Sequence, residues 1–213
     1  QGNCTSSFLE DPHTQLSANV LDFYREDDAR ITPQSVAENL DLIGANIRLS
    51  LVAEQAFEVV FRLDEGLSEL RKRYDVVVVD SLPSFGYLNT AALIAADYLI
   101  VPVKPAPYAL EGLKDLLESI RKLRQRLNKN MEVLGIVLNL VEGKPTRLGM
   151  EIEEVLRQQY GDLIFSTVLH KAIKMEESPS FRQSIMEYEP RGKASGEFEQ
   201  FLDECIHKLG MKR

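Results

Sequence analysis

The sequence has little cysteine, no excess of positive charge and no long hydrophobic run. Its two cysteines, Cys4 and Cys205, are too few for a disulfide framework or a metal cluster, and they suit a reducing cytoplasm. The net charge of −8 excludes a global basic field, so any contact with nucleic acid needs a local basic patch. No apolar run approaches the roughly 18 residues of a membrane span. We therefore expect a cytoplasmic globular protein.

A glycine-rich phosphate cradle is also missing. A P-loop needs Gly, four residues and then Gly-Lys-Ser/Thr, because backbone N–H groups surround the phosphates and the lysine reaches them. The pair Gly143-Lys144 has Leu138 where the first glycine would stand, and Pro145 follows it. There is no Gly-x-Gly-x-x-Gly either. A solvated loop after a strand is therefore the better interpretation of residues 143–145.

The most informative stretch present is a run of four valines, Val76 to Val79, that ends at Asp80. An uninterrupted β-branched run is typical of a strand buried on both faces, as in parallel α/β sheets. Such a strand delivers its last residue to the carboxyl edge of the sheet, where these folds bind ligands. Asp80 then has the position of a Walker B aspartate, which holds Mg²⁺ beside nucleotide phosphates. The alternative is an aspartate that begins a turn.

Hydrophobic periodicity predicts alternating helices and strands along the chain. The predicted helices cover residues 17–24, 50–73, 87–95, 108–127, 148–160, 174–181 and 194–209, and the predicted strands cover residues 40–43, 75–80, 98–103, 133–140 and 163–169. This alternation favours right-handed βαβ units. We expect one α/β domain over residues 1–213, a doubly wound, mostly parallel sheet flanked by helices.

Five motifs carry a resemblance to a known family. They are Gln-Gly-Asn-Cys-Thr-Ser-Ser at 1–7, Tyr-Asp-Val-Val-Val-Val-Asp-Ser-Leu-Pro-Ser at 74–84, the stretches 95–103 and 108–112, Glu-Glu-Ser-Pro-Ser at 176–180, and Glu-Tyr-Glu-Pro at 187–190. In this order they resemble the ParA/Soj-type partition ATPases, members of the ParA/MinD family of P-loop NTPases. The resemblance covers nearly the whole chain and implies the fold expected above.

The resemblance also implies what the sequence does not contain. In the family a deviant Walker A motif, Lys-Gly-Gly-x-Gly-Lys-Thr, lies upstream of the segment that Gln1 begins. We therefore expect the chain to be the C-terminal portion of a ParA-like ATPase domain that lacks its first βαβ unit. The alternative is a natural relative without a P-loop. The genomic sequence upstream of Gln1 discriminates between them.

The resemblance assigns roles to residues that match the family motifs. Asp80 matches the Walker B carboxylate that acts on Mg²⁺. Pro83 and Ser84 match the switch turn after it, although Leu82 replaces the family's first proline. Asn139 matches a residue that faces adenine, where an amide can pair with both donor and acceptor edges of a base. A strand-end capping asparagine is the alternative.

Two further groups of residues follow from the family comparison. His170 and Lys171 occupy the second loop that flanks adenine, but the sequence matches poorly and only the position carries over. Lys171, Lys174 and Arg182 form the expected DNA-binding patch, with Lys174 at the place of a family arginine. Phosphate contacts of this kind are independent of sequence. The acidic pair Glu176-Glu177 dilutes the patch, so an ordinary solvated loop is the alternative.

The resemblance implies an ATPase of chromosome or plasmid partitioning that uses ATP and Mg²⁺. It would form a nucleotide-sandwich homodimer, bind DNA non-specifically at the nucleoid, and hydrolyse ATP when a ParB-like protein stimulates it. The alternatives are an interaction module without nucleotide and a MinD-like membrane ATPase. The polar face of the last helix is acidic, with Glu197, Glu199, Asp203 and Glu204. We expect this face to be solvated and no membrane binding, because anionic lipid repels it.

Overall fold

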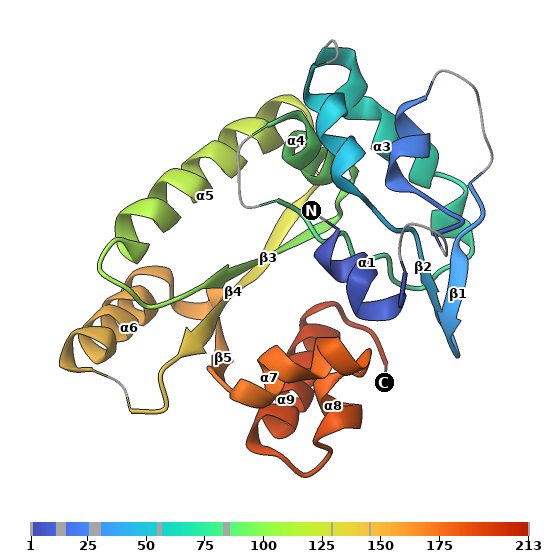
Figure 1. Cartoon of the computed structure of the whole chain (residues 1–213). Coiled ribbons are helices and arrows are strands. Elements are labelled where there is room, and N and C mark those ends of the chain that lie inside the picture. The colour runs from blue at the N-terminus through green and yellow to red at the C-terminus, as the bar shows by residue number, and fades with distance from the viewer. Residues whose placement is uncertain are drawn as a thin grey trace. The chain divides into compact units, whose positions relative to one another are not determined.

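The structure is a computed structural model of the 213-residue chain, shown in Figure 1. It describes residues 2–11, 16–25, 31–54, 57–82, 86–128, 130–144 and 146–212, with the side chains of residues 53–54 left out. The chain divides into two compact units, Gln1–Ala96 and Asp97–Arg213. The single domain expected over residues 1–213 stays a prediction, and each unit is described by itself.

The first unit contains short helices and one hairpin. Its elements are α1 (Asn3–Phe8), η1 (Val20–Tyr24), β1 (Gln34–Ala37), β2 (Leu40–Leu42), η2 (Ile47–Glu54), η3 (Phe57–Phe61), α3 (Arg62–Leu67), η4 (Leu70–Lys72) and α4 (Tyr87–Ala95). The helix predicted over 50–73 is wrong as one element, since η2, η3, α3 and η4 replace it. Its apolar period is nevertheless real, because Val60, Leu63 and Leu67 are buried. β-branched and aromatic residues at 57–61 weaken the continuous helix.

A two-residue turn connects β1 and β2, which pair antiparallel with Ala37 opposite Leu40. Asn39 adopts a φ of 57°, the left-handed conformation that asparagine tolerates and that tight hairpin turns require. The predicted strand at 40–43 is thus confirmed as β2. Its partner β1 was not predicted, because Gln-Ser-Val-Ala shows no apolar alternation.

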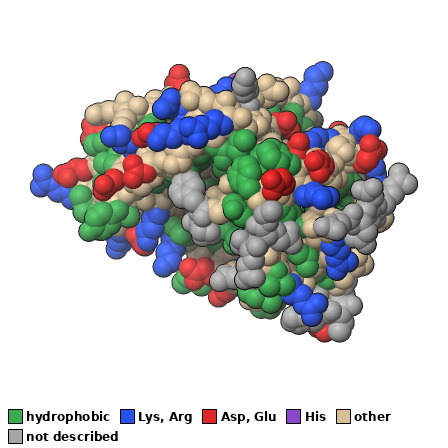
Figure 2. Space-filling view, turned by 90° about the horizontal axis from the view of Figure 1, so that it is seen from above, with side chains coloured by type: hydrophobic (Ala, Val, Ile, Leu, Met, Phe, Trp, Pro, Cys, Tyr) green, Lys and Arg blue, Asp and Glu red, His purple; other side chains and the backbone are tan. Residues whose placement is uncertain are grey.

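The predicted strand at 75–80 is wrong for this structure. The segment belongs to no strand, and its valines are exposed, Val78 by 87%. An extended run becomes a strand only when a neighbouring strand accepts its N–H and C=O groups, and none of the described residues does so. Tyr74 fixes the start of the segment by donating a hydrogen bond to Asp41. Figure 2 shows hydrophobic side chains reaching the surface between charged ones on the face that it presents.

The second unit is a parallel α/β sheet. Its elements are β3 (Tyr98–Val103), α5 (Ala109–Arg126), β4 (Glu132–Val141), α6 (Arg147–Tyr160), η5 (Gly161–Leu163), β5 (Ile164–His170), α7 (Ile173–Glu177), η6 (Ser178–Phe181), α8 (Ile185–Tyr188) and α9 (Lys193–Lys208). The strand order is β3-β4-β5, and both pairings are parallel. The strands and helices predicted from residue 87 onward are confirmed within a few residues, whereas η5 and α8 were not predicted.

Helices cover both faces of this sheet, as the doubly wound class requires. Ile136 and Leu138 of β4 pack with α5 and α6 residues on one face, whereas Val137 packs with Phe165 and α9 on the other. All three β4 side chains are at most 3% exposed. Each such burial contributes about 1.5–3 kcal/mol. The sequence of β4 is therefore continuously apolar because helices cover the strand on both faces of the sheet.

Candidate functional site

Asp80 ends the extended valine segment and is exposed. The structure brings it close to α1, although the two are far apart in sequence. Partial desolvation and then the negative charge of Asp80 raise the pKa of the Cys4 thiol. Cys4 of the opening motif and Asp80, the Walker B candidate, therefore lie within electrostatic range of each other in the first unit.

Thr5 holds α1 in this position. Its hydroxyl donates to the Ala45 carbonyl over 3.2 Å and accepts from the Ala45 N–H over 2.8 Å, and Thr5 is only 2% exposed. Gly2 precedes the helix with a φ of 78°, where a side chain would be strained, and an added Cβ would lie 2.6 Å from the Ala45 oxygen. The glycine of the opening motif is thus needed for the approach to Ala45.

The chemistry of Asp80 fits a magnesium ligand. No hydrogen bond or ion pair from the described residues occupies its carboxylate, and these residues form no group of three or more His, Cys, Asp or Glu that could hold a metal. Mg²⁺ is commonly bound by only one or two carboxylates, together with water and substrate phosphates. A lone exposed carboxylate therefore fits Mg²⁺ and not a structural zinc site. Pro83 and Ser84, predicted beside it, lie outside the described residues.

In the second unit the carboxyl ends of β4 and β5 carry the other predicted residues. Leu138 lies opposite Val168 and Val141 opposite His170, so the register places Asn139 and His170 at one edge of the sheet. The half-buried Asn139 accepts the Leu140 N–H on its amide oxygen over 2.8 Å, and Leu140 has a φ of 55°. The Asn139 NH₂ group remains as a donor at this edge.

His170 is the last residue of β5, and Lys171 follows it. The Lys171 N–H donates to the Val141 carbonyl over 2.9 Å, which ties the start of this loop to β4. The His170 imidazole Nδ1 lies 2.8 Å from Glu197 Oε1, and the His170 N–H donates to Glu197 Oε2 over 2.9 Å. Sequence reasoning found nothing to orient His170, and the structure supplies Glu197.

The acidic face of α9 was predicted to be solvated, and for two of its residues this is wrong. Glu197 and Glu204 stand two turns apart on the same side of the helix, and both reach β5. Glu204 accepts the N–H groups of Ser166 and Thr167 over 2.9 and 2.7 Å, and also the Thr167 hydroxyl. β5 is an edge strand, so its free donors need acceptors, and carboxylates supply them. The seven-residue spacing of Glu197 and Glu204, which places both on one side of a helix, was the signal in the sequence that could have indicated this shared contact.

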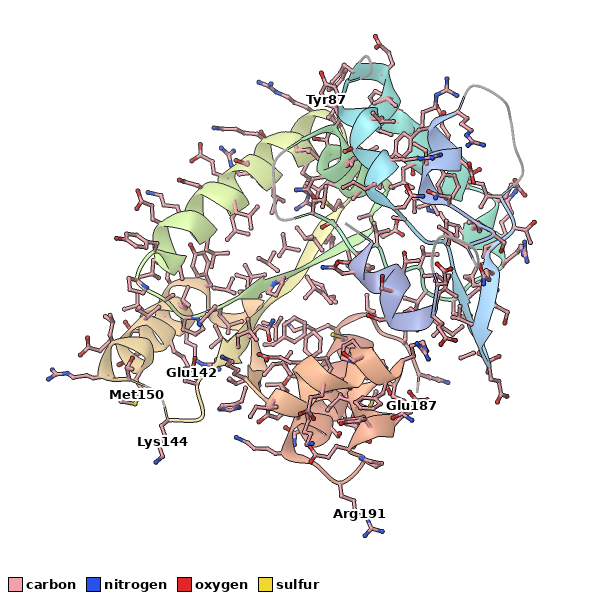
Figure 3. The ribbon with its side chains drawn as sticks, viewed as in Figure 1. Tyr87, Glu142, Lys144, Met150, Glu187 and Arg191 are labelled. Atoms are coloured by element: carbon pink, nitrogen blue, oxygen red, sulfur yellow. The ribbon has the colours of Figure 1, made fainter. Side chains whose placement is uncertain are left out.

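The predicted DNA-binding residues lie on the exposed α7–η6 region. Lys174 forms an ion pair of 2.9 Å with Glu177, which raises the pKa of the lysine, and its Nζ lies 5.5 Å from the centre of the Tyr188 ring. Arg182 ends η6 with a φ of 55°. Nearby Arg191 projects away from the ribbon in Figure 3. The sequence suggested that Glu176 and Glu177 reduce the positive charge of this patch, and the structure shows a direct ion pair between Lys174 and Glu177.

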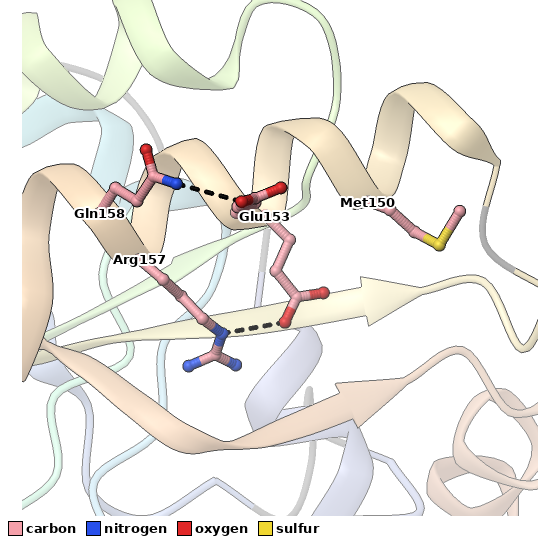
Figure 4. A pocket seen from close by; sticks show the side chains of 5 residues that line it. Met150, Glu153, Arg157 and Gln158 are labelled. Atoms are coloured by element: carbon pink, nitrogen blue, oxygen red, sulfur yellow. Dashed lines mark hydrogen bonds and ion pairs between the residues drawn. The ribbon is translucent and has the colours of Figure 1, made fainter.

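A surface pocket on α6 does not add a ligand site to those described above. A pocket of about 500 Å³ is lined by Met150, Glu153, Glu154, Arg157 and Gln158, all on α6 (Figure 4). Its arginine is already paired: Arg157 forms an ion pair with Glu153 over 3.0 Å and donates to the Phe165 carbonyl over 3.2 Å. Lys144, part of the rejected P-loop candidate, is exposed and points outward in Figure 3. Among the described residues no helix is long and apolar enough to cross a bilayer.

Comparison with known proteins identifies relatives over most of the chain. Residues 1–133 match the family described as the AAA domain. The sporulation initiation inhibitor protein Soj of Bacillus subtilis is 32% identical over 210 residues, which are 95% of this chain and 80% of the relative. The chromosome-partitioning ATPase Soj of Thermus thermophilus is also 32% identical, over 79% of this chain and 64% of the relative.

Solved structures share the fold. A Borrelia burgdorferi protein named for plasmid partition and bound to AMPPNP has a TM-score of 0.80 at 24% identity, over 98% of this chain and 83% of that one. Cobyrinic acid a,c-diamide synthase from Mycobacterium smegmatis, with an ATP analogue and magnesium, has a TM-score of 0.77 at 22% identity. The match covers 100% of this chain and 81% of that one. The family match and the identity to Soj show that this chain belongs to the ParA/Soj-type partition ATPases.

Proposed function

We propose that the protein is an ATPase of chromosome or plasmid partitioning that binds ATP with Mg²⁺. The observation that carries this proposal is the family membership, and the electrostatic effect of Asp80 on Cys4 of the opening motif supports it. Asp80 acts on the metal. Asn139, His170 and Lys171 are the proposed contacts of the base, and Pro83 and Ser84 are the residues that match the family's switch turn. The test is Mg²⁺-dependent ATP hydrolysis by the product of the whole gene, and no turnover above background would contradict the proposal.

The partners follow from the same proposal. ATP brings two copies together as a homodimer, the dimer binds DNA without sequence preference at the nucleoid, and a ParB-like protein stimulates hydrolysis. Gel filtration of the whole-gene product with and without ATP tests the first step. A monomer under both conditions would contradict the ATP-dependent dimer. A rate of ATP hydrolysis that does not rise when a ParB-like protein is added would contradict the proposed stimulation.

Nucleotide binding by residues 1–213 alone is expected to be undetectable. These residues contain no P-loop, and without backbone N–H groups and lysines around the phosphates, a triphosphate has no firm anchor. Calorimetry of this chain with ATP and Mg²⁺ should give no heat of binding, while the whole-gene product serves as the comparison. A micromolar affinity of residues 1–213 would show that a phosphate site exists within them.

DNA binding is expected to weaken when Lys174 is replaced by glutamate in the whole-gene product. The change removes a phosphate contact, so affinity should fall alike for any duplex, and the salt slope should drop by about one. Gel shifts over several salt concentrations measure both. Lys122→Glu on α5 is the matched control. Like Lys174, Lys122 is exposed and forms an ion pair within its own helix, in this case with Glu118 over 2.8 Å. Equal DNA retention by the two variants would remove Lys174 from the DNA surface.

Membrane binding is not expected. The apolar stripe of α9 is engaged, since Phe198, Phe201 and Cys205 pack against the sheet, and anionic lipid would repel the remaining acidic side chains. Anionic vesicles should leave the whole-gene product in the supernatant after sedimentation. Pelleting with these vesicles, in the presence or absence of ATP, would favour the MinD-like alternative.

A further inference from the structure

Glu197 contacts both the backbone and the imidazole of His170, the last residue of β5. Glu197 Oε2 accepts the His170 N–H over 2.9 Å, and Glu197 Oε1 lies 2.8 Å from Nδ1. The Glu197 side chain is 12% exposed, whereas the His170 side chain is 29% exposed. The ring is therefore fixed on its Nδ1 side and partly open to solvent.

Glu197 remains a carboxylate in this position. Burial by itself raises its pKa, but the hydrogen bonds from the His170 backbone and ring, together with Lys193, outweigh burial and lower the pKa. Lys193 Nζ lies 3.3 Å from Oε1, on the same helix. The Glu197 carboxylate of α9 is thus an ionised hydrogen-bond acceptor, and its two partners are His170 and Lys193.

A carboxylate only accepts hydrogen bonds, so Nδ1 of His170 must be the donor. In the neutral imidazole this leaves Nε2 without a proton, as an acceptor. No described residue hydrogen-bonds to Nε2. The neutral ring thus presents Nε2 as a fixed acceptor at the carboxyl edge of the sheet, on the strand next to Asn139.

We propose that Glu197 is a positioning residue that holds His170 Nε2 as the acceptor for the amino group of a 6-aminopurine, an inference that rests on the proposed nucleotide site. The 6-amino group of adenine is a donor and matches this acceptor. A 6-oxo purine presents an oxygen there, and two acceptors repel each other. His170 and Glu197 together then determine base preference.

Glu197→Gln tests this through the geometry of the amide. The His170 N–H can only donate, so the amide oxygen must take the Oε2 position. The NH₂ group then faces Nδ1 and donates to it, which moves the ring proton to Nε2. Lys193 is 72% exposed and can turn away from the amide. The variant therefore converts Nε2 from an acceptor into a donor without changing the size of the side chain.

The experiment compares native whole-gene product, Glu197→Gln and Glu204→Gln. Glu204→Gln is the matched control, because Glu204 also joins α9 to β5 but contacts no histidine. Ring ¹⁵N shifts of His170, assigned with His170→Gln and recorded from about pH 6 to 9, report charge and tautomer directly. Affinities for ATP and ITP, which differ at purine position 6, report base preference.

We expect an Nδ1–H ring in the native protein and the control, and an Nε2–H ring in Glu197→Gln. The ratio of ATP to ITP affinity should fall about tenfold in Glu197→Gln only, the effect of one hydrogen bond to a partly buried group. An Nε2–H ring in the native protein overturns the inference. So does an unchanged ratio when the tautomer has switched and nucleotide still binds. Failure of both nucleotides to bind any of the proteins overturns the proposed function as well.

Discussion

Replacing Asp80 by alanine in the whole-gene product should abolish Mg²⁺-dependent ATP hydrolysis while the fold survives. A metal ion contributes several kcal/mol to the stabilisation of transition-state charge. Each 1.36 kcal/mol corresponds to a factor of ten, so a rate loss of about 100-fold or more is expected. Steady-state phosphate release at several Mg²⁺ concentrations measures it. A native rate would show that Asp80 is only a turn residue, the alternative that its sequence leaves open.

The stability of the Asp80 variant separates this effect from unfolding. Asp80 is exposed, and none of the described residues pairs with it, so its free energy of unfolding should change by no more than about 0.5 kcal/mol. Asp75→Ala is the matched control, because it removes the same charge from the same extended segment. Equal loss of activity in both variants would assign the effect to the charge of the segment and not to metal binding.

Replacing Phe165 by alanine should destabilise the protein by about 3–5 kcal/mol, because the ring is large and fully buried. Phe165 is 0% exposed and packs edge to face on Phe201, with 5.0 Å between the ring centroids. The ring also fills the space beside Gly135, where a Cβ added to the glycine would lie 2.5 Å from the ring. No flexible neighbour can refill that volume without moving α9. Denaturant unfolding measures the loss.

Leu202→Ala is the control for Phe165, since Leu202 is on the same helix α9 but 40% exposed. Its loss in unfolding free energy should be about 1 kcal/mol or less. Similar losses for both variants would mean that α9 is not packed on the sheet as described. In that case the Glu197 contact with His170 would lose its support, because α9 carries Glu197.

Local sequence pattern predicted α4 of the first unit and the elements of the second unit well. The strand at 98–103 and the helix at 87–95 match β3 and α4 to the residue, because their apolar periods and bordering residues lie within the segments themselves. The stop of α6 at Gly161 was predicted for the same reason, since glycine at a helix end is a local signal. Family resemblance then added roles for Asp80 and Asn139, which periodicity alone does not assign.

The same reasoning failed wherever a residue's state depends on distant partners. Four consecutive valines predict a strand, yet pairing is decided by neighbours, and residues 76–79 have none among the described residues. Residues 50–73 carry a helical apolar period, but the backbone follows it through four short helical pieces. The apolar positions Val60, Leu63 and Leu67 are buried as the period predicts, whereas Leu51 is exposed and the predicted single helix is not formed.

The sequence by itself determined the family, the alternation of helices and strands in the second unit, and the identity of Asp80 as a candidate metal ligand. Only the tertiary structure decided that Cys4 lies near Asp80 and that Glu197 and Glu204 bind the edge of β5. Helical and strand periods arise from contacts between near neighbours, which a sequence displays directly. Hydrogen bonds between residues 27 or more positions apart, such as those of Glu197 and Glu204 to β5, depend on how whole elements pack.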